Sequence, residues 1–227
     1  MSTTVKKSKE LTEVQNQELE TLFERARKAM EIVESYDQEK LDRLAQAVAW
    51  SVANKSTFDR LVKLSIEESG LGDPVSRAAK RFKIRGVLRD ALRQKSVGAV
   101  EVIPEKGITK YAKPVGIIGS IVPTTNPDLT PAGTAINSVK TRNAVIFAPH
   151  PRSKKTTFET VRLMREALER EGCPADLLQC IENVSLPMTN ELMARADLVL
   201  ATGGQAMVKA AYSSGTPAYG VGAGNST

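Results

Sequence analysis

The chain has 227 residues, of which 41% are hydrophobic and 26% charged, a composition typical of a folded protein with one large domain or one and a half. Its formal net charge is +6, but aromatic residues make up only 4% and no stacking or zinc-ligand pattern accompanies the charge. We therefore expect no nucleic-acid partner. The sequence also has neither an apolar run long enough for a membrane span nor the apolar core of a secretory signal.

The two cysteines do not form a metal-binding or disulfide motif. Cys173 stands in a Gly-Cys-Pro sequence at a predicted helix end, and Cys180 stands in an apolar segment. Their separation of seven residues fits neither metal ligation nor a Cys-x-x-Cys motif. We therefore expect a reduced, cytoplasmic protein without a metal site.

From Leu11 to about Gln94 the chain has the periodicity of amphipathic helices. Two apolar faces recur at spacings of three and four: Leu19, Leu22, Phe23, Ala26, Met30 and Val33, then Leu41, Leu44, Ala45, Val48, Ala49 and Val52. We expect both faces to lie in the core. The alternative for the first helix is that its apolar face docks on a partner or on a compartment shell.

A basic stretch lies near the end of this helical region. Its members have helical spacing: Arg77, Lys80, Arg81, Lys83, Arg85 and Arg89. The simplest interpretation is a solvated helix face, and the alternative is a surface that attracts a phosphorylated cofactor.

After Gln94 the periodicity changes. The segments SVGAVEVIP and ITKYAKP alternate apolar and polar residues on either side of Glu105-Lys106-Gly107, which predicts a β-hairpin. Strands at 115–122, 144–148, 178–181, 198–201 and 218–221 then alternate with helices at 130–141, 153–171, 187–195 and 205–212. This alternation with short loops predicts an α/β fold. A helical N-terminal region precedes a doubly wound, Rossmann-like parallel sheet.

The predicted strand at 115–122 ends in a turn, Pro-Thr-Thr-Asn-Pro, that contains Asn126. In open α/β sheets, ligands bind beyond the carboxyl ends of the strands. A carboxamide between two prolines at that edge is well placed to donate hydrogen bonds to a substrate. The alternative is that Asn126 only caps the helix that follows.

A second turn, Thr202-Gly203-Gly204, lies between a predicted strand and the helix at 205–212. Glycines at the start of a helix let its backbone N–H groups and its dipole approach a diphosphate. The alternative is that the glycines serve only the conformation of the turn. The G-x-G-x-x-G motif of a standard Rossmann domain is absent from the sequence.

Read in order, four segments resemble the aldehyde dehydrogenase superfamily: KPVGIIGSIVPTTNP, KTRNAVIFAPHP, LATGGQAMVKAAY and GVGAGN. The likeness is to its CoA-acylating branch, which includes the aldehyde dehydrogenase half of bifunctional aldehyde-alcohol dehydrogenases. It covers the chain closely from about Tyr111 onward and the helical region loosely. It implies that Asn126 is a catalytic residue whose amide holds the oxyanion formed when a cysteine attacks the aldehyde.

The resemblance also implies a site for NAD. Gly203 and Gly204 match the turn that meets the NAD diphosphate, and Thr202 adds a hydroxyl. It further implies cofactor contacts by Pro123, Thr124 and Gly222. His150 is the only histidine, and it is either a ribose or phosphate contact or a hydrogen-bonded structural residue. Hydrolytic relatives have a ribose-binding lysine where this chain has Ala148, which leaves the choice between NAD and NADP open.

The segment from Tyr219 to Asn225 has no acidic residue, although hydrolytic relatives carry there the glutamate that activates water. Without that base a thioester intermediate should persist until a thiol attacks it, so the resemblance implies coenzyme A as co-substrate. Neither Cys173 nor Cys180 matches the nucleophile of the family. We therefore predict that the catalytic cysteine and the catalytic domain are absent from this chain.

The sequence thus predicts the cofactor-binding portion of an NAD-dependent, CoA-acylating aldehyde dehydrogenase that acts on an aldehyde and CoA. We expect three parts: a helical region at 1–95, a hairpin at 96–113 that serves oligomerisation, and an NAD-binding core at 114–227. A homo-oligomer is expected for the full-length protein, in the cytoplasm or inside a bacterial microcompartment. Two alternatives remain: a non-catalytic nucleotide-binding or assembly module, and a relative of the acyl-phosphate reductases.

Overall fold

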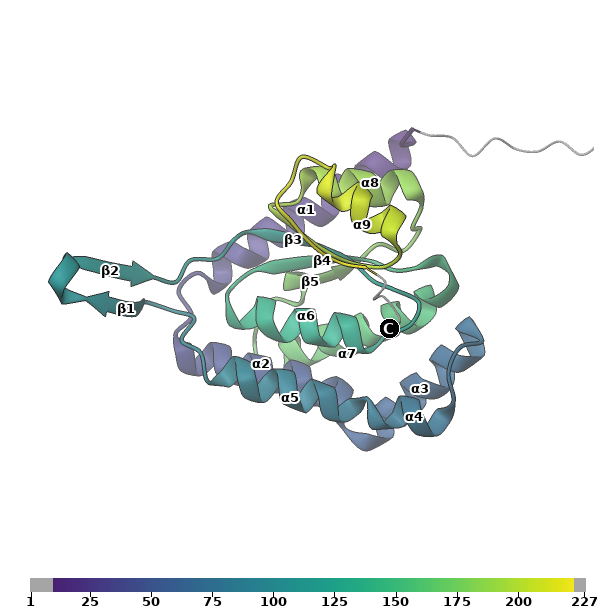
Figure 1. Cartoon of the computed structure of the whole chain (residues 1–227), viewed down its shortest axis with the longest axis horizontal. Helices are drawn as coiled ribbons and strands as arrows, with labels where there is room; N and C mark the ends of the chain where they lie inside the picture. Colours follow the sequence, from purple (N-terminus) through teal and green to yellow (C-terminus); the bar gives the residue numbers. More distant parts are fainter. Residues whose placement is uncertain (1–9, 223–227) are drawn as a thin grey trace, which may run out of the picture.

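The computed structural model describes residues 10–222, and a parallel sheet lies at its centre (Figure 1). Its five strands have the order β5-β4-β3-β6-β7. Their bounds are β3 Ile117–Ile121, β4 Ala144–Ala148, β5 Leu178–Cys180, β6 Leu198–Thr202 and β7 Ala218–Val221. The chain runs outward from β3 through β4 to β5 and then returns to β6 on the other side of β3. This reversal confirms the doubly wound sheet.

Helices cover both faces of the sheet (Figure 1). One face carries α6 (Leu129–Lys140) and α7 (Lys154–Arg170), and the other carries α1 (Glu13–Val33), α8 (Leu186–Arg195) and α9 (Gln205–Tyr212). Because both faces are covered, β3 and β4 are buried along their whole length. The burial explains why these strands are apolar runs without polar alternation.

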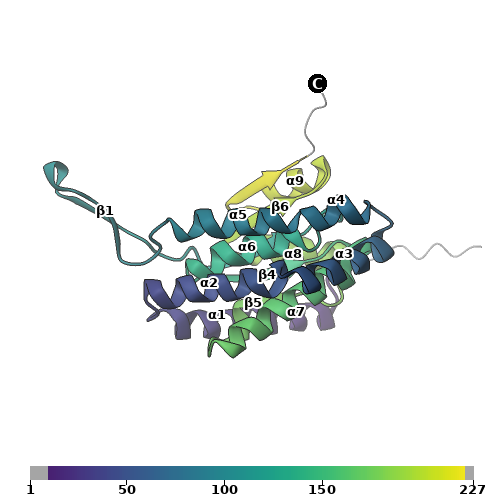
Figure 2. The ribbon, with the colours of Figure 1, turned by 90° about the horizontal axis from the view of Figure 1, so that it is seen from below.

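The remaining helices form a further layer over α6 and α7, which Figure 2 shows from below. They are α2 (Gln38–Ala53), α3 (Lys55–Ser69), α4 (Pro74–Ala79) and α5 (Arg81–Leu92). Side chains of Asp37 and Asn54 cap α2 and α3, and Gly70 ends α3 in the left-handed conformation. The helical N-terminal region is therefore as predicted.

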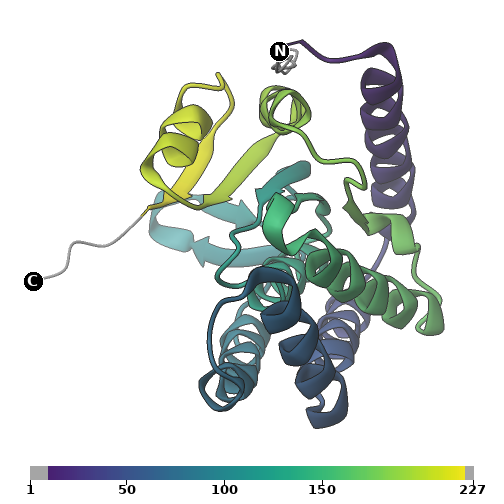
Figure 3. The ribbon, with the colours of Figure 1, turned by 90° about the vertical axis from the view of Figure 1, so that its right-hand side faces the viewer.

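Both predicted apolar faces of this region are in the core. Leu19, Phe23 and Val33 of α1 are buried, and α1 packs against β3, β4 and β5, as Figure 3 shows from the side. Leu41 and Val48 of α2 are fully buried. The packing favours the core interpretation of α1 over docking on a partner.

The hairpin consists of β1 (Ala99–Ile103) and β2 (Ile108–Tyr111), which pair antiparallel and project away from the rest of the molecule (Figures 1 and 2). Its outward side chains include the exposed Val102 and Tyr111. The division of the chain into three parts, and the role of the hairpin in assembly, stay predictions.

Two side chains outside β3 anchor its first residues. The side-chain oxygen of Asn143 accepts hydrogen bonds from the backbone N–H groups of Val115 (2.7 Å) and Gly116 (2.9 Å). Asp197 Oδ2 accepts one from Ile117 N at 2.7 Å. Because Asn143 immediately precedes β4 and Asp197 precedes β6, these bonds align β3 with both of its neighbours.

Candidate cofactor and active site

A pocket of about 680 Å³ lies at the carboxyl ends of β3, β4, β6 and β7, where the strand order reverses. Its walls are the turns after these strands and the start of α8. The pocket is lined by every residue predicted to bind a cofactor: Pro123, Thr124, His150, Thr202, Gly203, Gly204 and Gly222. The fold therefore brings together four turns that are far apart in the sequence, at the place where doubly wound sheets bind their ligands.

The turn between β6 and α9 presents backbone to this pocket. Gly204 is the N-cap of α9, and the first turn of the helix carries no acidic side chain. Neither Gly203 nor Gly204 has a positive φ angle. A Cβ atom on Gly204 would meet nothing within 4 Å, and one on Gly203 would make only ordinary contact with Met207. The conformation of the turn therefore does not require glycine, and the open space beside it suits a group that approaches the backbone closely.

Thr124 and His150 form a hydrogen-bonded pair on the adjacent wall. The Arg152 backbone N–H donates to His150 Nδ1 (3.1 Å), so Nδ1 is the acceptor and the Thr124 hydroxyl, 2.8 Å away, is its second donor. The proton of the neutral ring is then on Nε2. Burial, with a smaller contribution from the Arg152 charge, lowers the pKa of His150. At neutral pH the imidazole is therefore uncharged and has one N–H left to donate.

Asn126 stands next to the pocket-lining Thr125 but is not itself part of the pocket wall. The helix N-cap is Asp128, whose carboxylate accepts from Leu129 N at 2.7 Å. The interpretation of Asn126 as the helix cap is therefore wrong. Its side-chain carbonyl instead accepts a hydrogen bond from Lys80 Nζ at 2.8 Å.

The basic stretch differs from the expected solvated face at the two residues nearest this turn. Arg77 is only 3% exposed, and it donates to Ser65 Oγ (2.6 Å) and to the Thr125 carbonyl (3.3 Å). Lys80 is half-buried, and burial is the main reason why its pKa is lowered. The helical spacing of these residues is visible in the sequence, but spacing alone does not distinguish the side chains that face the Asn126 turn.

The two thiols have environments unsuited to nucleophiles. Burial raises the pKa of Cys173 to about 12. Burial also raises the pKa of Cys180, and the carboxylates of Glu182 and Glu18 raise it further. A catalytic cysteine needs an electropositive, accessible setting that favours the thiolate. Neither thiol in the described part of the chain has one.

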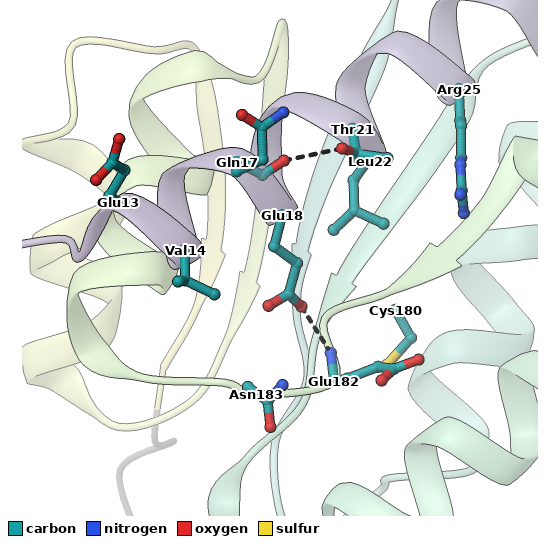
Figure 4. Close-up of a pocket in the computed structure, with 10 residues that line it drawn as sticks. All are labelled: Glu13, Val14, Gln17, Glu18, Thr21, Leu22, Arg25, Cys180, Glu182 and Asn183. Carbon is teal, nitrogen blue, oxygen red and sulfur yellow. Dashed lines mark hydrogen bonds between the residues drawn. The ribbon is translucent and has the colours of Figure 1, made fainter.

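Cys180 also belongs to a different pocket, of about 620 Å³, between α1 and the loop after β5 (Figure 4). In the close-up, Glu18 reaches from α1 to the backbone N–H of Glu182, a 3.3 Å hydrogen bond. This pocket and the one predicted for the cofactor have no lining residue in common.

Comparison with known proteins agrees with the geometry. Residues 2–219 match the sequence pattern described as the aldehyde dehydrogenase family. The chain belongs to this family. Within residues 10–222, this aldehyde dehydrogenase chain contains no helix with the length and apolar character that crossing a membrane requires.

Among its relatives are acylating aldehyde dehydrogenases. The chain is 50% identical over 205 residues to a sulfoacetaldehyde dehydrogenase from Acholeplasma sp, and the match covers 90% of this chain and 42% of that protein. It superimposes with a TM-score of 0.88 on an acetylating aldehyde dehydrogenase from Geobacillus thermoglucosidasius, at 38% identity, covering 95% of this chain and 48% of that one.

A propionaldehyde dehydrogenase from Rhodopseudomonas palustris, with bound CoA and an acylated cysteine, matches with a TM-score of 0.77 and 30% identity. The match covers 91% of this chain and 47% of that chain. These relatives confirm the resemblance to the CoA-acylating branch. The chain spans less than half the length of each.

Proposed function

We propose that this chain is the NAD-binding portion of a CoA-acylating aldehyde dehydrogenase, which converts an aldehyde, CoA and NAD into acyl-CoA and NADH. The observation that carries the proposal is the single pocket lined by all the predicted cofactor residues, with Asn126 beside its rim. The relatives supply the reaction class, because one of them holds CoA and an acylated cysteine.

The residues of the pocket suit a dinucleotide. The free N–H groups at the start of α9 would hold its diphosphate, with Gly203 and Gly204 allowing close approach. Thr124 orients His150 so that the Nε2 proton is free to donate to a ribose hydroxyl. The bound nicotinamide would supply the hydride acceptor of the reaction.

We propose NAD in preference to NADP, because the pocket offers little positive charge for a 2′-phosphate. His150 is uncharged at neutral pH since its pKa is lowered. The Arg152 guanidinium is directed elsewhere and donates to the Ser69 carbonyl at 3.0 Å. We expect NAD to bind at least about tenfold more tightly than NADP.

Asn126 would act on the oxygen of the aldehyde. Attack of a thiolate on the carbonyl carbon turns that oxygen into an oxyanion, and a carboxamide N–H already held in place stabilises the charge as it develops. The raised pKa values of both thiols support a nucleophile supplied by residues outside 1–227. Sequencing the reading frame past Thr227 tests this: a cysteine-containing catalytic half supports the enzyme, and a stop codon supports a non-catalytic module.

Binding of NAD can be measured on the chain alone by titration calorimetry. We expect weak binding, and we expect Gly204→Val to abolish it because the valine side chain would fill the open space beside the turn. The matched control is Gly133→Ala on α6, where a Cβ also meets nothing within 4 Å. A folded sample that binds no NAD at millimolar concentration contradicts the proposal.

Turnover requires the complete enzyme with its catalytic half, and sulfoacetaldehyde is the first substrate to test because a relative is named for it. NADH formation should depend strongly on CoA and release acyl-CoA. Asn126→Ala should lower kcat by about 100-fold while the Kd for NAD stays nearly unchanged. Rapid formation of a free carboxylic acid without CoA would refute the acylating assignment.

A further inference from the structure

We propose that Lys80 is a positioning residue that turns the NH₂ group of the Asn126 side chain toward the pocket. The inference rests on the proposed role of Asn126 at the oxyanion. It assigns a function to a lysine that lies 46 residues away in sequence, on the junction between α4 and α5.

The chemistry of the two groups determines the orientation. A lysine ammonium has three donors and no acceptor, so only the carbonyl side of a carboxamide can face it. Lys80 Nζ lies 2.8 Å from Asn126 Oδ1, and this bond requires Nδ2 to lie on the opposite side of the amide. A half-turn of the amide would place two sets of donors against each other, so the ammonium selects one of the two possible orientations.

The nitrogen side of the amide lies beside the side chain of a residue that lines the pocket. Asn126 Nδ2 has a long contact of 3.5 Å with Thr125 Oγ1, and Thr125 lines the pocket. Such a contact is weak, so the amide protons are largely left to donate elsewhere. The positive charge on the carbonyl side also polarises the amide and makes its N–H groups stronger donors.

The lysine is itself held in place. Its Nζ is 3.4 Å from the Thr125 carbonyl, which also accepts from Arg77 at 3.3 Å. Arg77 donates a hydrogen bond to Ser65 Oγ, and its guanidinium lies 3.7 Å from the buried carboxylate oxygen Oδ1 of Asp128. Arg77 and Lys80 therefore clamp the turn from one side, and Asp128 balances part of their charge. A site of this kind can hold an amide still before a substrate arrives.

The first test observes the amide directly in the chain of 227 residues, labelled with ¹⁵N-asparagine. The Asn126 side-chain NMR signal is identified by its loss in Asn126→Ala. We expect Lys80→Met to shift this signal and Lys80→Arg to shift it less, since arginine keeps a donor. The control Lys83→Met removes an exposed lysine one turn further on and should leave the signal in place. An unchanged signal in Lys80→Met overturns the proposal.

The second test measures turnover in the complete enzyme. Lys80→Met should lower kcat by about tenfold with little change in KM for NAD, and Lys80→Arg should restore most of the loss. Adding Lys80→Met to Asn126→Ala should cause little further loss, because the lysine acts through the amide. Additive losses of about 1,000-fold would overturn the proposal. If Asn126→Ala leaves kcat unchanged while the NMR signal moves, the oxyanion role fails and the orienting contact stands.

Discussion

The close approach of Gly116, just before β3, to Asp197, just before β6, predicts a large loss of stability for Gly116→Ala. Gly116 has φ +132°, a conformation that L-residues rarely adopt, and its new Cβ would lie 2.2 Å from Asp197 Oδ2. The carboxylate would have to move, and it would then lose the hydrogen bond that Ile117 N donates to Asp197 Oδ2 at 2.7 Å. The substitution therefore combines backbone strain with the loss of a partly buried hydrogen bond.

The two costs can be estimated separately. Strained backbone at a non-glycine residue costs about 1–3 kcal/mol. A buried N–H group left without its acceptor costs about 1–3 kcal/mol. We therefore expect the free energy of unfolding to fall by about 3 kcal/mol, which corresponds to a decrease in Tm of about 6–12 °C for a domain of this size.

Urea unfolding followed by circular dichroism measures this loss. The control is Gly133→Ala in α6, where the added Cβ meets nothing within 4 Å and should stabilise the helix by about 0.5–1 kcal/mol. In an Asp197→Ala background, Gly116→Ala should cost less, since the hydrogen bond is already lost. A Gly116→Ala protein within about 0.5 kcal/mol of the wild type would refute the account of how β3 is aligned with β6.

Three further predictions concern a buried thiol and two sets of ion pairs. Cys173, with its pKa raised to about 12, should react with Ellman's reagent at least about 100-fold more slowly in the native than in the urea-unfolded protein, and rapid native labelling would contradict its burial. Arginines hold the pKa of Glu159 at about 2, so its ion pairs stabilise the fold above the ordinary carboxyl pKa and stop doing so as pH falls toward 2. The stability difference between wild type and Glu159→Gln, present at pH 7, should therefore shrink over that range, and a constant difference would argue against the pairing. Asp42→Asn should cost about 3 kcal/mol in urea unfolding because it leaves the buried Lys140 ammonium without its partner, and a loss as small as that of the exposed-pair control Asp59→Asn would show that the pair contributes little.

The secondary structure of the sheet region follows closely from local sequence. The helix predicted at 130–141 is α6, Leu129–Lys140, and the strand predicted at 144–148 has the same bounds in the structure. The strand predicted at 115–122 begins two residues later, at Ile117, because Val115 and Gly116 donate to the Asn143 side chain and not to a neighbouring strand. Periodicity records which residues are buried, but it does not record which partner takes each backbone hydrogen bond.

The candidate site was predictable in its strand-end residues and not in its supporting ones. A parallel sheet places the ends of all its strands along one edge, so the strand pattern and the Thr-Gly-Gly turn were enough to expect a ligand near Gly204. Thr124 and His150 were expected in the same pocket because of the resemblance to the aldehyde dehydrogenase family. The sequence offered Asn126 as a helix cap as well as a donor. Either Asn126 or Asp128 could have satisfied the first N–H of α6, so the sequence could not choose between them. In the structure the cap is Asp128.

By itself the sequence determined the succession of strands and helices along the chain and the apolar faces of α1 and α2, because burial leaves a local periodic pattern. Its resemblance to a known family indicated the residues that gather at the pocket. Only the tertiary structure decided that Arg77 and Lys80 face the Asn126 turn while their exposed neighbours Lys83 and Arg85 face outward. The side that each of the two short helices α4 and α5 turns inward depends on how its ridges pack against the neighbouring elements. That packing joins residues far apart in the chain, and no local pattern of charges contains it.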